Sequence, residues 1–258
     1  MALAPTRPRG TASRWLTLAV LAFSLLVVAL DLTVLNVAIP TLSTELEPSS
    51  VQLLWIVDIY SLMVAGFLIS AGTLGDRWGR KRLVLLGFAL FGGASALAAW
   101  SNSPNMLITA RALLGVSAAV IMPSTLSIIR NVFTDRRERT LALGIWASVA
   151  SAGAAVGPVL AGFLLERFWW GSVFLINLPV MGAALVFGAI IIPESRDPDP
   201  PRWDWIGALL SVAGLMALVY GIQHIGADGL QTGTVLPTVA GAALLVVLVV
   251  WLRRTPHP

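Results

Sequence analysis

The chain has 258 residues, of which 57% are hydrophobic and only 12% are charged, and its mean hydropathy is +0.85. Typical soluble domains carry about 25% charged residues, so this composition excludes an ordinary soluble domain and favours a protein that crosses the bilayer several times. With no cysteine and only two histidines, the chain lacks the residues for disulfides, cysteine-ligated metals or a histidine-rich metal site. We therefore expect no metal.

Apolar stretches of membrane-spanning length follow one another along the chain. A helix needs about 20 mostly apolar residues to cross the bilayer, whereas strands of a membrane barrel are shorter and alternate polar with apolar residues. Eight stretches meet the helical requirement, and we predict an all-α integral membrane protein. The predicted spans are residues 15–40, 51–73, 83–100, 105–129, 140–165, 169–192, 205–225 and 234–252.

The basic residues predict the orientation of these spans. Fifteen of the 17 Lys and Arg residues lie in the N-terminal arm, in alternate loops and at the C-terminus. Arg167 lies on the other side, and Arg111 lies within a span. Because basic loops stay in the cytoplasm, both termini are expected to be cytoplasmic. This distribution accounts for the net charge of +4, so no nucleic-acid partner is expected.

A segment rich in proline and charge, PESRDPDPPRW at residues 193–203, divides the chain. Such a composition is typical of a stiff, solvated linker, here on the cytoplasmic side. We expect a six-span N-terminal bundle over residues 15–192 and two further spans within residues 204–252. Residues 1–14 would form a cytoplasmic arm, and residues 253–258 a cytoplasmic tail.

Three ionisable side chains fall well inside predicted spans: Asp31, Asp58 and Arg111. At 1.5 Å per residue they lie about 14, 11 and 9 Å below the outer surface, which predicts that all three share one layer. Charged groups at such depth cost about 2.5–3.5 kcal/mol each, so they normally face a bundle interior or a wet cavity. A carboxylate held near neutrality there can take up and release protons. A purely structural ion pair between Arg111 and one aspartate is the alternative, although it leaves the second acid unexplained.

The fifth predicted span carries a second pattern, the stretch GAAVGPVLAG. Gly153 and Gly157 are four residues apart, so they share a helix face and allow another helix to approach closely. Pro158 removes a backbone hydrogen bond and permits a kink. Spacing alone does not separate a moving helix from static packing.

Longer stretches resemble motifs of a known family. GTLGDRWGRKR at residues 72–82 resembles the cytoplasmic-loop motif of the major facilitator superfamily of transporters. ITARALLGVSAA at residues 108–119 is similar to the fourth-helix motif of that family, with Leu114 where glutamine is usual and Ser117 where glycine is usual. GAAVGPVLAG, residues 153–162, resembles its fifth-helix antiporter motif.

One branch of the family is matched more closely. LDLTVLNVAIP at residues 30–40 resembles the first-helix motif of the fourteen-span drug:proton antiporters. Residues 53–67 and 121–133 are similar to the QacA- and EmrB-like multidrug exporters within that branch. Members of the branch have six more spans after the eighth, whereas this sequence stops at WLRRTPHP, so we expect the C-terminal six-span bundle to be absent.

The resemblance implies a role for each matching residue. Asp31 and Asp58 would meet a cationic substrate or a proton, and Arg111 would assist proton transfer. The cytoplasmic-loop motif would form a charged latch between two transporter halves. Its matching residues are Gly72, Gly75, Asp76, Arg77, Gly79, Arg80 and Lys81. The fifth-helix motif would shape a hinge-like helix, and its matching residues are Gly153, Gly157, Pro158 and Gly162.

The expected function is therefore proton-coupled efflux of lipophilic and quaternary ammonium cations across the cell membrane, a multidrug-resistance activity. The expected partners are the lipid bilayer, the cations and protons, with the proton gradient as the energy source and no cofactor. Three alternatives stay open: a truncated product that does not transport, one half of a split transporter that assembles with a separate C-terminal half, and an exporter of another substrate such as a natural antibiotic. An enzyme is not expected, because the sequence contains no Ser–His arrangement, metal-ligand cluster or phosphate-binding loop.

Overall fold

The computed structural model describes residues 11–196, 204–228 and 231–254, and every regular element in this part of the chain is a helix. The helices are α1 (Thr11–Leu46), α2 (Ser50–Trp78), α3 (Arg80–Ala99), α4 (Pro104–Val132), α5 (Arg136–Leu165), α6 (Ser172–Leu175), α7 (Asn177–Ile191), α8 (Trp205–Asp228) and α9 (Thr232–Arg254). Parts of the expected arm, linker and tail lie outside the described residues, namely 1–10, 197–203 and 255–258.

Eight helical segments among the described residues are long and apolar enough to cross a membrane, and they match the eight predicted spans one by one. The sixth consists of α6 and α7 together, Ser172–Ile191. Large apolar side chains also face outward, an arrangement that suits hydrocarbon rather than water. Val159, Ile190 and Leu209 are 75%, 74% and 70% exposed. The prediction of an all-α integral membrane fold is confirmed.

Two helix ends differ from the predicted span ends. α1 continues through Pro40, because an interior proline removes one backbone hydrogen bond without ending a helix whose flanking turns are held by packing. Leu42, in the turn that follows, is fully buried. α5 begins before the predicted span because Asp135 caps its first turn: the Asp135 side chain accepts the backbone N–H of Glu138 at 2.9 Å.

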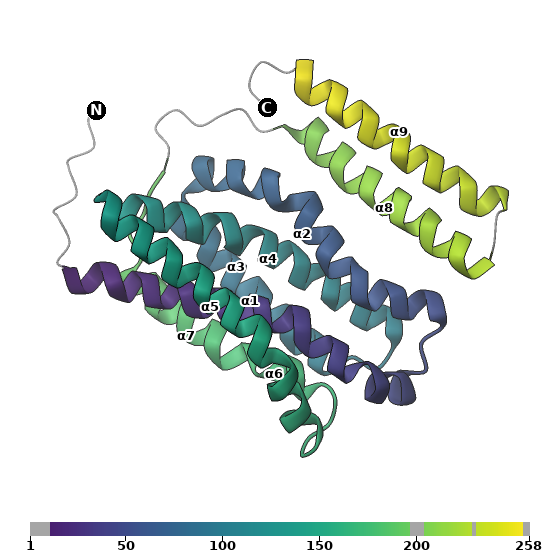
Figure 1. The fold of residues 1–258 in the computed structure, drawn as a ribbon, viewed down its shortest axis with the longest axis horizontal. Helices are drawn as coiled ribbons and strands as arrows, with labels where there is room; N and C mark the ends of the chain where they lie inside the picture. Colours follow the sequence, from purple (N-terminus) through teal and green to yellow (C-terminus); the bar gives the residue numbers. More distant parts are fainter. Residues whose placement is uncertain (1–10, 197–203, 229–230, 255–258) are drawn as a thin grey trace.

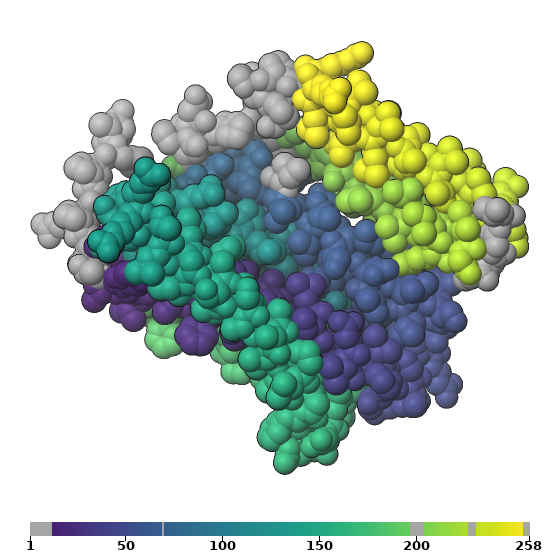
Figure 2. Space-filling view, in the orientation of Figure 1, coloured from purple at the N-terminus to yellow at the C-terminus, as the bar shows by residue number. Residues whose placement is uncertain are grey.

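Helices that are distant in the sequence pack side by side. α1 lies against α5 and α7, α3 lies against α4 and α7, and α4 also packs on α2 (Figure 1). α8 and α9 form a hairpin on the flank of this bundle, and the space-filling view shows α8 between α2 and α9 (Figure 2). As a result, side chains from α1, α2, α4 and α7 can meet in one core.

That core is apolar apart from a small polar group near its centre. Phe88, Phe91 and Phe174 are fully buried and fill much of the space between the helices. Arg111 and Tyr60 are nevertheless the two largest side chains among the fully buried ones that the structure describes. A buried arginine needs a partner of opposite charge and acceptors for its remaining N–H groups. The partners of Arg111 therefore define the candidate site.

Candidate functional site

Asp31 on α1 and Arg111 on α4 form a buried ion pair. Nη1 of Arg111 donates to Oδ2 of Asp31 at 2.5 Å, and the two side chains are 2% and 0% exposed. The sequence alternative in which Arg111 pairs with one aspartate is thus observed, and the partner is Asp31. Away from water, such a pair is strong only when hydrogen bonds satisfy the rest of both groups.

Arg111 is held from a second side by α2. Its Nε donates to the backbone carbonyl of Ile56 at 3.2 Å, and its guanidinium carbon lies 4.6 Å from the centre of the Tyr60 ring. The Tyr60 hydroxyl in turn donates to the backbone carbonyl of Val28 on α1, at 3.4 Å. Arg111 therefore joins α4 to both α1 and α2, through one charged contact and two neutral ones.

The other oxygen of the carboxylate is bound by Asn177 at the start of α7. Its amide Nδ2 donates to Oδ1 of Asp31 at 3.2 Å and to the Ser95 hydroxyl on α3 at 3.0 Å. The amide oxygen of Asn177 is buried without a hydrogen-bond partner among the described residues. Asp31 thus lies between a guanidinium and an amide, and five helices contribute to this polar group.

Three members of this polar group were missed by the sequence reasoning: Tyr60, Ser95 and Asn177. Asn177 is the one with a usable signal, since a side-chain amide inside the apolar run LINLPV is costly unless it is bonded. Serine and tyrosine are common in apolar helices and carry no comparable signal.

Asp58 is bonded to another helix, and the predicted shared layer of the three ionisable residues stays a prediction. Its Oδ2 accepts a hydrogen bond from Nε2 of Gln223 on α8 at 2.9 Å, and the side chain is half-buried. The reason is the helical repeat. Ile56 and Tyr60 face the core of the bundle, and Asp58 is two residues from each, which is about 200° around the helix. A similar depth along two helices therefore does not predict that their side chains touch.

Aromatic side chains precede both members of the Asp58–Gln223 contact by one helical turn, Trp55 on α2 and Tyr220 on α8. Trp55, one turn before Asp58, lies 6.3 Å from the ring of Tyr220 on α8, measured between ring centres. Tyr220 also stacks on His224 with ring centres 4.0 Å apart. Among the described residues, the Asp58 carboxylate is hydrogen-bonded to the neutral amide of Gln223. Its negative charge is therefore not balanced by a cation, whereas the charge of Asp31 is balanced by Arg111.

The cytoplasmic-loop motif forms the turn between α2 and α3. Gly79 ends α2 and precedes α3 with a φ of +105°, a conformation that residues with a Cβ rarely adopt. A Cβ there would also lie 2.6 Å from Oε1 of Glu194. Asp76 pairs with Arg80 across the turn at 2.7 Å, whereas Arg77 is exposed.

The same turn is bound by the end of α7 and the residues that follow it. Lys81 donates to the backbone carbonyl of Ala189 at 2.6 Å, and the backbone N–H of Arg80 donates to the carbonyl of Ser195 at 2.9 Å. Gly72 and Gly75 lie close to α4, where added Cβ atoms would reach ordinary contact distance from Pro123 and Ser124. The latch between two transporter halves stays a prediction.

The fifth-helix glycines divide into two groups. A Cβ at Gly153 would lie 2.7 Å from the backbone carbonyl of Leu26, and one at Gly157 would collide with the Thr33 hydroxyl, both on α1. Their predicted use in close helix approach is confirmed. Gly162 has open space around it, and Pro158 is exposed within a continuous helix. Gly153 and Gly157 therefore hold the part of α1 that carries Asp31 against α5.

The chain matches the Major Facilitator Superfamily over residues 21–258. It is 48% identical over 227 residues to the multidrug efflux pump LfrA of Mycolicibacterium smegmatis, covering 88% of this chain and 45% of that protein. It is 43% identical over 233 residues to the methyl viologen resistance protein SmvA of Salmonella typhimurium, covering 90% and 47%. It is 38% identical over 232 residues to the methylenomycin A resistance protein of Bacillus subtilis, covering 90% and 49%.

The chain thus spans about half the length of the curated relatives it matches. Those relatives are named as an efflux pump and as resistance proteins, not as enzymes. Together with eight apolar helices, the matches identify a multi-pass protein of the cell membrane.

Proposed function

Because this chain belongs to the Major Facilitator Superfamily, we propose that it supplies the N-terminal bundle and two linker helices of a proton-coupled exporter of lipophilic cations. The buried pair of Asp31 and Arg111 carries the proposal, since it places an acid where a change of charge would alter the contacts between helices. The energy source is the proton gradient, and no cofactor is needed. A complete transport path in this family lies between two bundles, so the activity proposed is that of the whole transporter.

Proton uptake at Asp31 would loosen the connection between α1 and α4. A neutral Asp31 no longer attracts the guanidinium, and Arg111 keeps only its neutral contacts with the Ile56 carbonyl and the Tyr60 ring. The free amide oxygen of Asn177 could accept the new O–H of the acid after the amide turns over. Each protonation state thus has its own set of partners, which is what a two-state transporter requires.

Asp58 suits the cation better than Asp31 does. The Asp31 charge is balanced by Arg111, whereas Asp58 is half-buried and bonded to the neutral amide of Gln223. Trp55 and Tyr220, one turn before Asp58 and Gln223, have their rings 6.3 Å apart. Aromatic faces attract quaternary ammonium groups. SmvA is named for resistance to methyl viologen, a dication, which supports a cationic substrate.

A natural antibiotic is the second candidate substrate. The observation that favours it is the 38% identity to a protein named for resistance to methylenomycin A. Two further alternatives, a product that does not transport and one half of a split transporter, concern the 258-residue chain alone.

The test compares accumulation of ethidium, methyl viologen and methylenomycin A in cells that lack their own cation pumps. The 258-residue chain is expressed with and without a C-terminal half from LfrA. We expect active export of the two cations, lost in Asp58→Asn and kept in the matched exposed control Glu45→Gln. Cation export that survives Asp58→Asn removes this residue from the site, and export of methylenomycin A alone replaces the proposed substrate. Export only with the added half would identify a split arrangement.

A further inference from the structure

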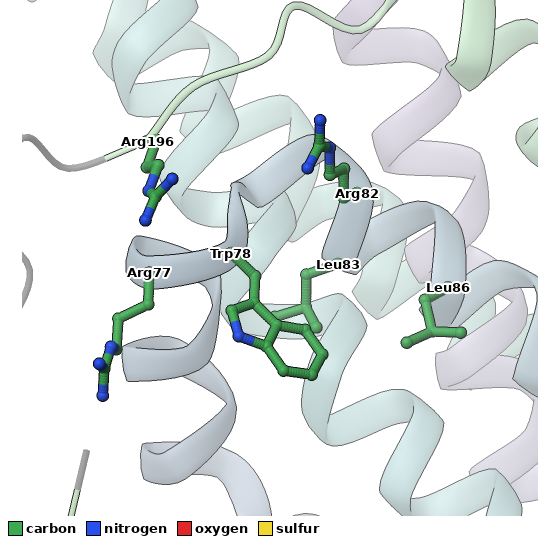
Figure 3. A pocket seen from close by; sticks show the side chains of 6 residues that line it. All are labelled: Arg77, Trp78, Arg82, Leu83, Leu86 and Arg196. Carbon is green, nitrogen blue, oxygen red and sulfur yellow. The ribbon is translucent and has the colours of Figure 1, made fainter.

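A cavity of about 300 Å³ lies at the turn between α2 and α3 and takes no part in the function proposed above. It is lined by Arg77, Trp78, Arg82, Leu83, Leu86 and Arg196 (Figure 3). In Figure 3 the Trp78 indole lies between Arg77 on one side and Leu86 on the other. Half of the lining residues are therefore arginines, and the other half are apolar or aromatic.

The three arginines come from three separate segments. Arg77 lies at the end of α2, Arg82 in the first turn of α3, and Arg196 in the segment after α7. A preference for basic residues in cytoplasmic loops explains why each loop is basic. It does not explain why three guanidinium groups line one cavity beside an exposed tryptophan.

These guanidinium groups are available to an anion. Arg82 is 82% exposed, and its described ion-pair partner, Oε2 of Glu194, is 3.6 Å away. Arg77 and Arg196 are exposed and have no ion pair or hydrogen bond with any described residue. The neighbouring Arg80, by contrast, is bound to Asp76. Among the described residues, these three positive charges have one carboxylate within ion-pair distance, that of Glu194, so the described part of the cavity carries a net positive charge.

An apolar strip continues from the cavity toward the membrane. Trp78 is 60% exposed, Leu86 is 46% exposed, and Leu90, one turn further along α3, is 43% exposed. Tryptophan is enriched at the level of lipid headgroups, and exposed leucines on a spanning helix face the acyl chains. A ligand that satisfies both parts has an anionic head and an apolar tail.

We propose that this cavity binds the phosphate headgroup of an anionic phospholipid, with its acyl chains along Leu86 and Leu90. Guanidinium groups bind phosphate oxygens through paired, charge-assisted hydrogen bonds. Basic pockets between helices at the cytoplasmic surface suit such headgroups, and the positive-inside rule predicts that this turn faces the cytoplasm. A zwitterionic lipid fits less well, because it would bring an ammonium group among three arginines. The bound lipid would join the α2–α3 turn to the segment after α7.

Native mass spectrometry of the purified protein tests the proposal. The protein is titrated with phosphatidylglycerol, with phosphatidylcholine, and with phosphatidylglycerol in the presence of excess inorganic phosphate. We expect phosphatidylglycerol to bind about tenfold more tightly than phosphatidylcholine, the factor that one charge-assisted hydrogen bond supplies at the lower end of its range. Inorganic phosphate is expected to leave that binding unchanged, because it lacks the tail. Equal affinity for the two lipids, or full displacement by inorganic phosphate, would overturn the proposal.

Two matched triple variants separate a specific site from general charge. Arg77→Gln, Arg82→Gln and Arg196→Gln together remove the cavity arginines and should abolish the preference for phosphatidylglycerol. Arg130→Gln, Arg136→Gln and Arg137→Gln remove the same charge from exposed positions in the next basic loop and should keep the preference. Equal losses in both variants would show that only net charge matters and would contradict a site. If the first triple variant does not fold, the single variants Arg196→Gln and Arg137→Gln are compared for the same lipid preference. Arg196 lies outside the described helices, so its replacement should not disturb folding.

Discussion

The amide of Asn177 donates a hydrogen bond to the carboxylate of Asp31 at 3.2 Å, although the two residues are 146 positions apart in the sequence. This contact places the start of α7 against the middle of α1. The Asn177 amide also donates to the Ser95 hydroxyl on α3, so this one side chain connects three helices. Asn177 thereby fixes the orientation of the carboxylate that Arg111 binds from the other side.

Replacement of Asn177 should weaken this connection measurably. Asn177→Ala removes two hydrogen bonds and leaves Oδ1 of Asp31 without a donor, so we expect the free energy of unfolding to fall by about 1–2 kcal/mol. Ser95→Ala removes only one of the two acceptors and should cost less. Chemical or thermal unfolding in detergent measures both variants. Equal stability of Asn177→Ala and the unmodified protein would show that the amide contributes nothing to the core.

The ion pair should behave as a unit. Arg111→Gln leaves a buried carboxylate without its charged partner, and we expect a loss of about 3–5 kcal/mol in stability. Asp31→Asn combined with Arg111→Gln removes both charges and should be the more stable of the two variants. A double-mutant cycle on the unfolding free energies gives the coupling between the residues. Additive losses would contradict a direct pairing in the folded protein.

The close approach of α5 to α1 can be tested at Gly157, with Gly162 on the same helix as the control. A Cβ at Gly157 would collide with the Thr33 hydroxyl, so Gly157→Ala should cost about 1–3 kcal/mol through overpacking. Thr33→Ala in the same chain removes that oxygen and should restore part of the loss. Gly162→Ala lies on the same helix in open space and should cost nothing. Unfolding midpoints that fall equally for Gly157→Ala and Gly162→Ala would contradict the packing.

Gln223 offers a way to test the uncompensated charge of Asp58 without changing Asp58 itself. Gln223→Lys brings an ammonium group to the position of the amide, 2.9 Å from the carboxylate in the native protein. The new ion pair should compete with a cationic substrate, and methyl viologen export should be lost. Gln223→Met, which keeps the length and adds no charge, should retain export. Export that persists in Gln223→Lys would separate Asp58 from the substrate path.

The spans could be predicted from the sequence because the bilayer imposes their length and apolar character, as the match of all eight shows. The ends could not, since Leu42 holds a turn beyond Pro40 through tertiary packing. For the site, the depth count identified Asp31 and Arg111 as charged groups inside the spans, but it did not say which aspartate is the partner of Arg111. Depth says nothing about the direction a side chain faces around the helix.

Asp58 shows that the direction of a side chain around its helix is needed as well as its depth. Counting residues from Ile56 and Tyr60 would have placed it on the opposite face of α2, had their contacts with Arg111 been known. Asn177 was missed for another reason, because an uncharged amide contributes little to a search for ionisable residues. The apolar run around Asn177 indicates that its amide needs a partner, but the identity of that partner follows only from the packing of α7 against α1.

Proton movement driven by methyl viologen in inside-out membrane vesicles tests the central claim most directly. A proton gradient is imposed across the vesicle membrane, and a pH-sensitive dye reports protons leaving the vesicle when the cation is added. The account predicts that the unmodified protein and the control Glu45→Gln release protons. Asp31→Asn should not, because the side chain at position 31 can no longer carry a proton. Proton release by Asp31→Asn at the unmodified rate would contradict the assignment of the proton to this carboxylate.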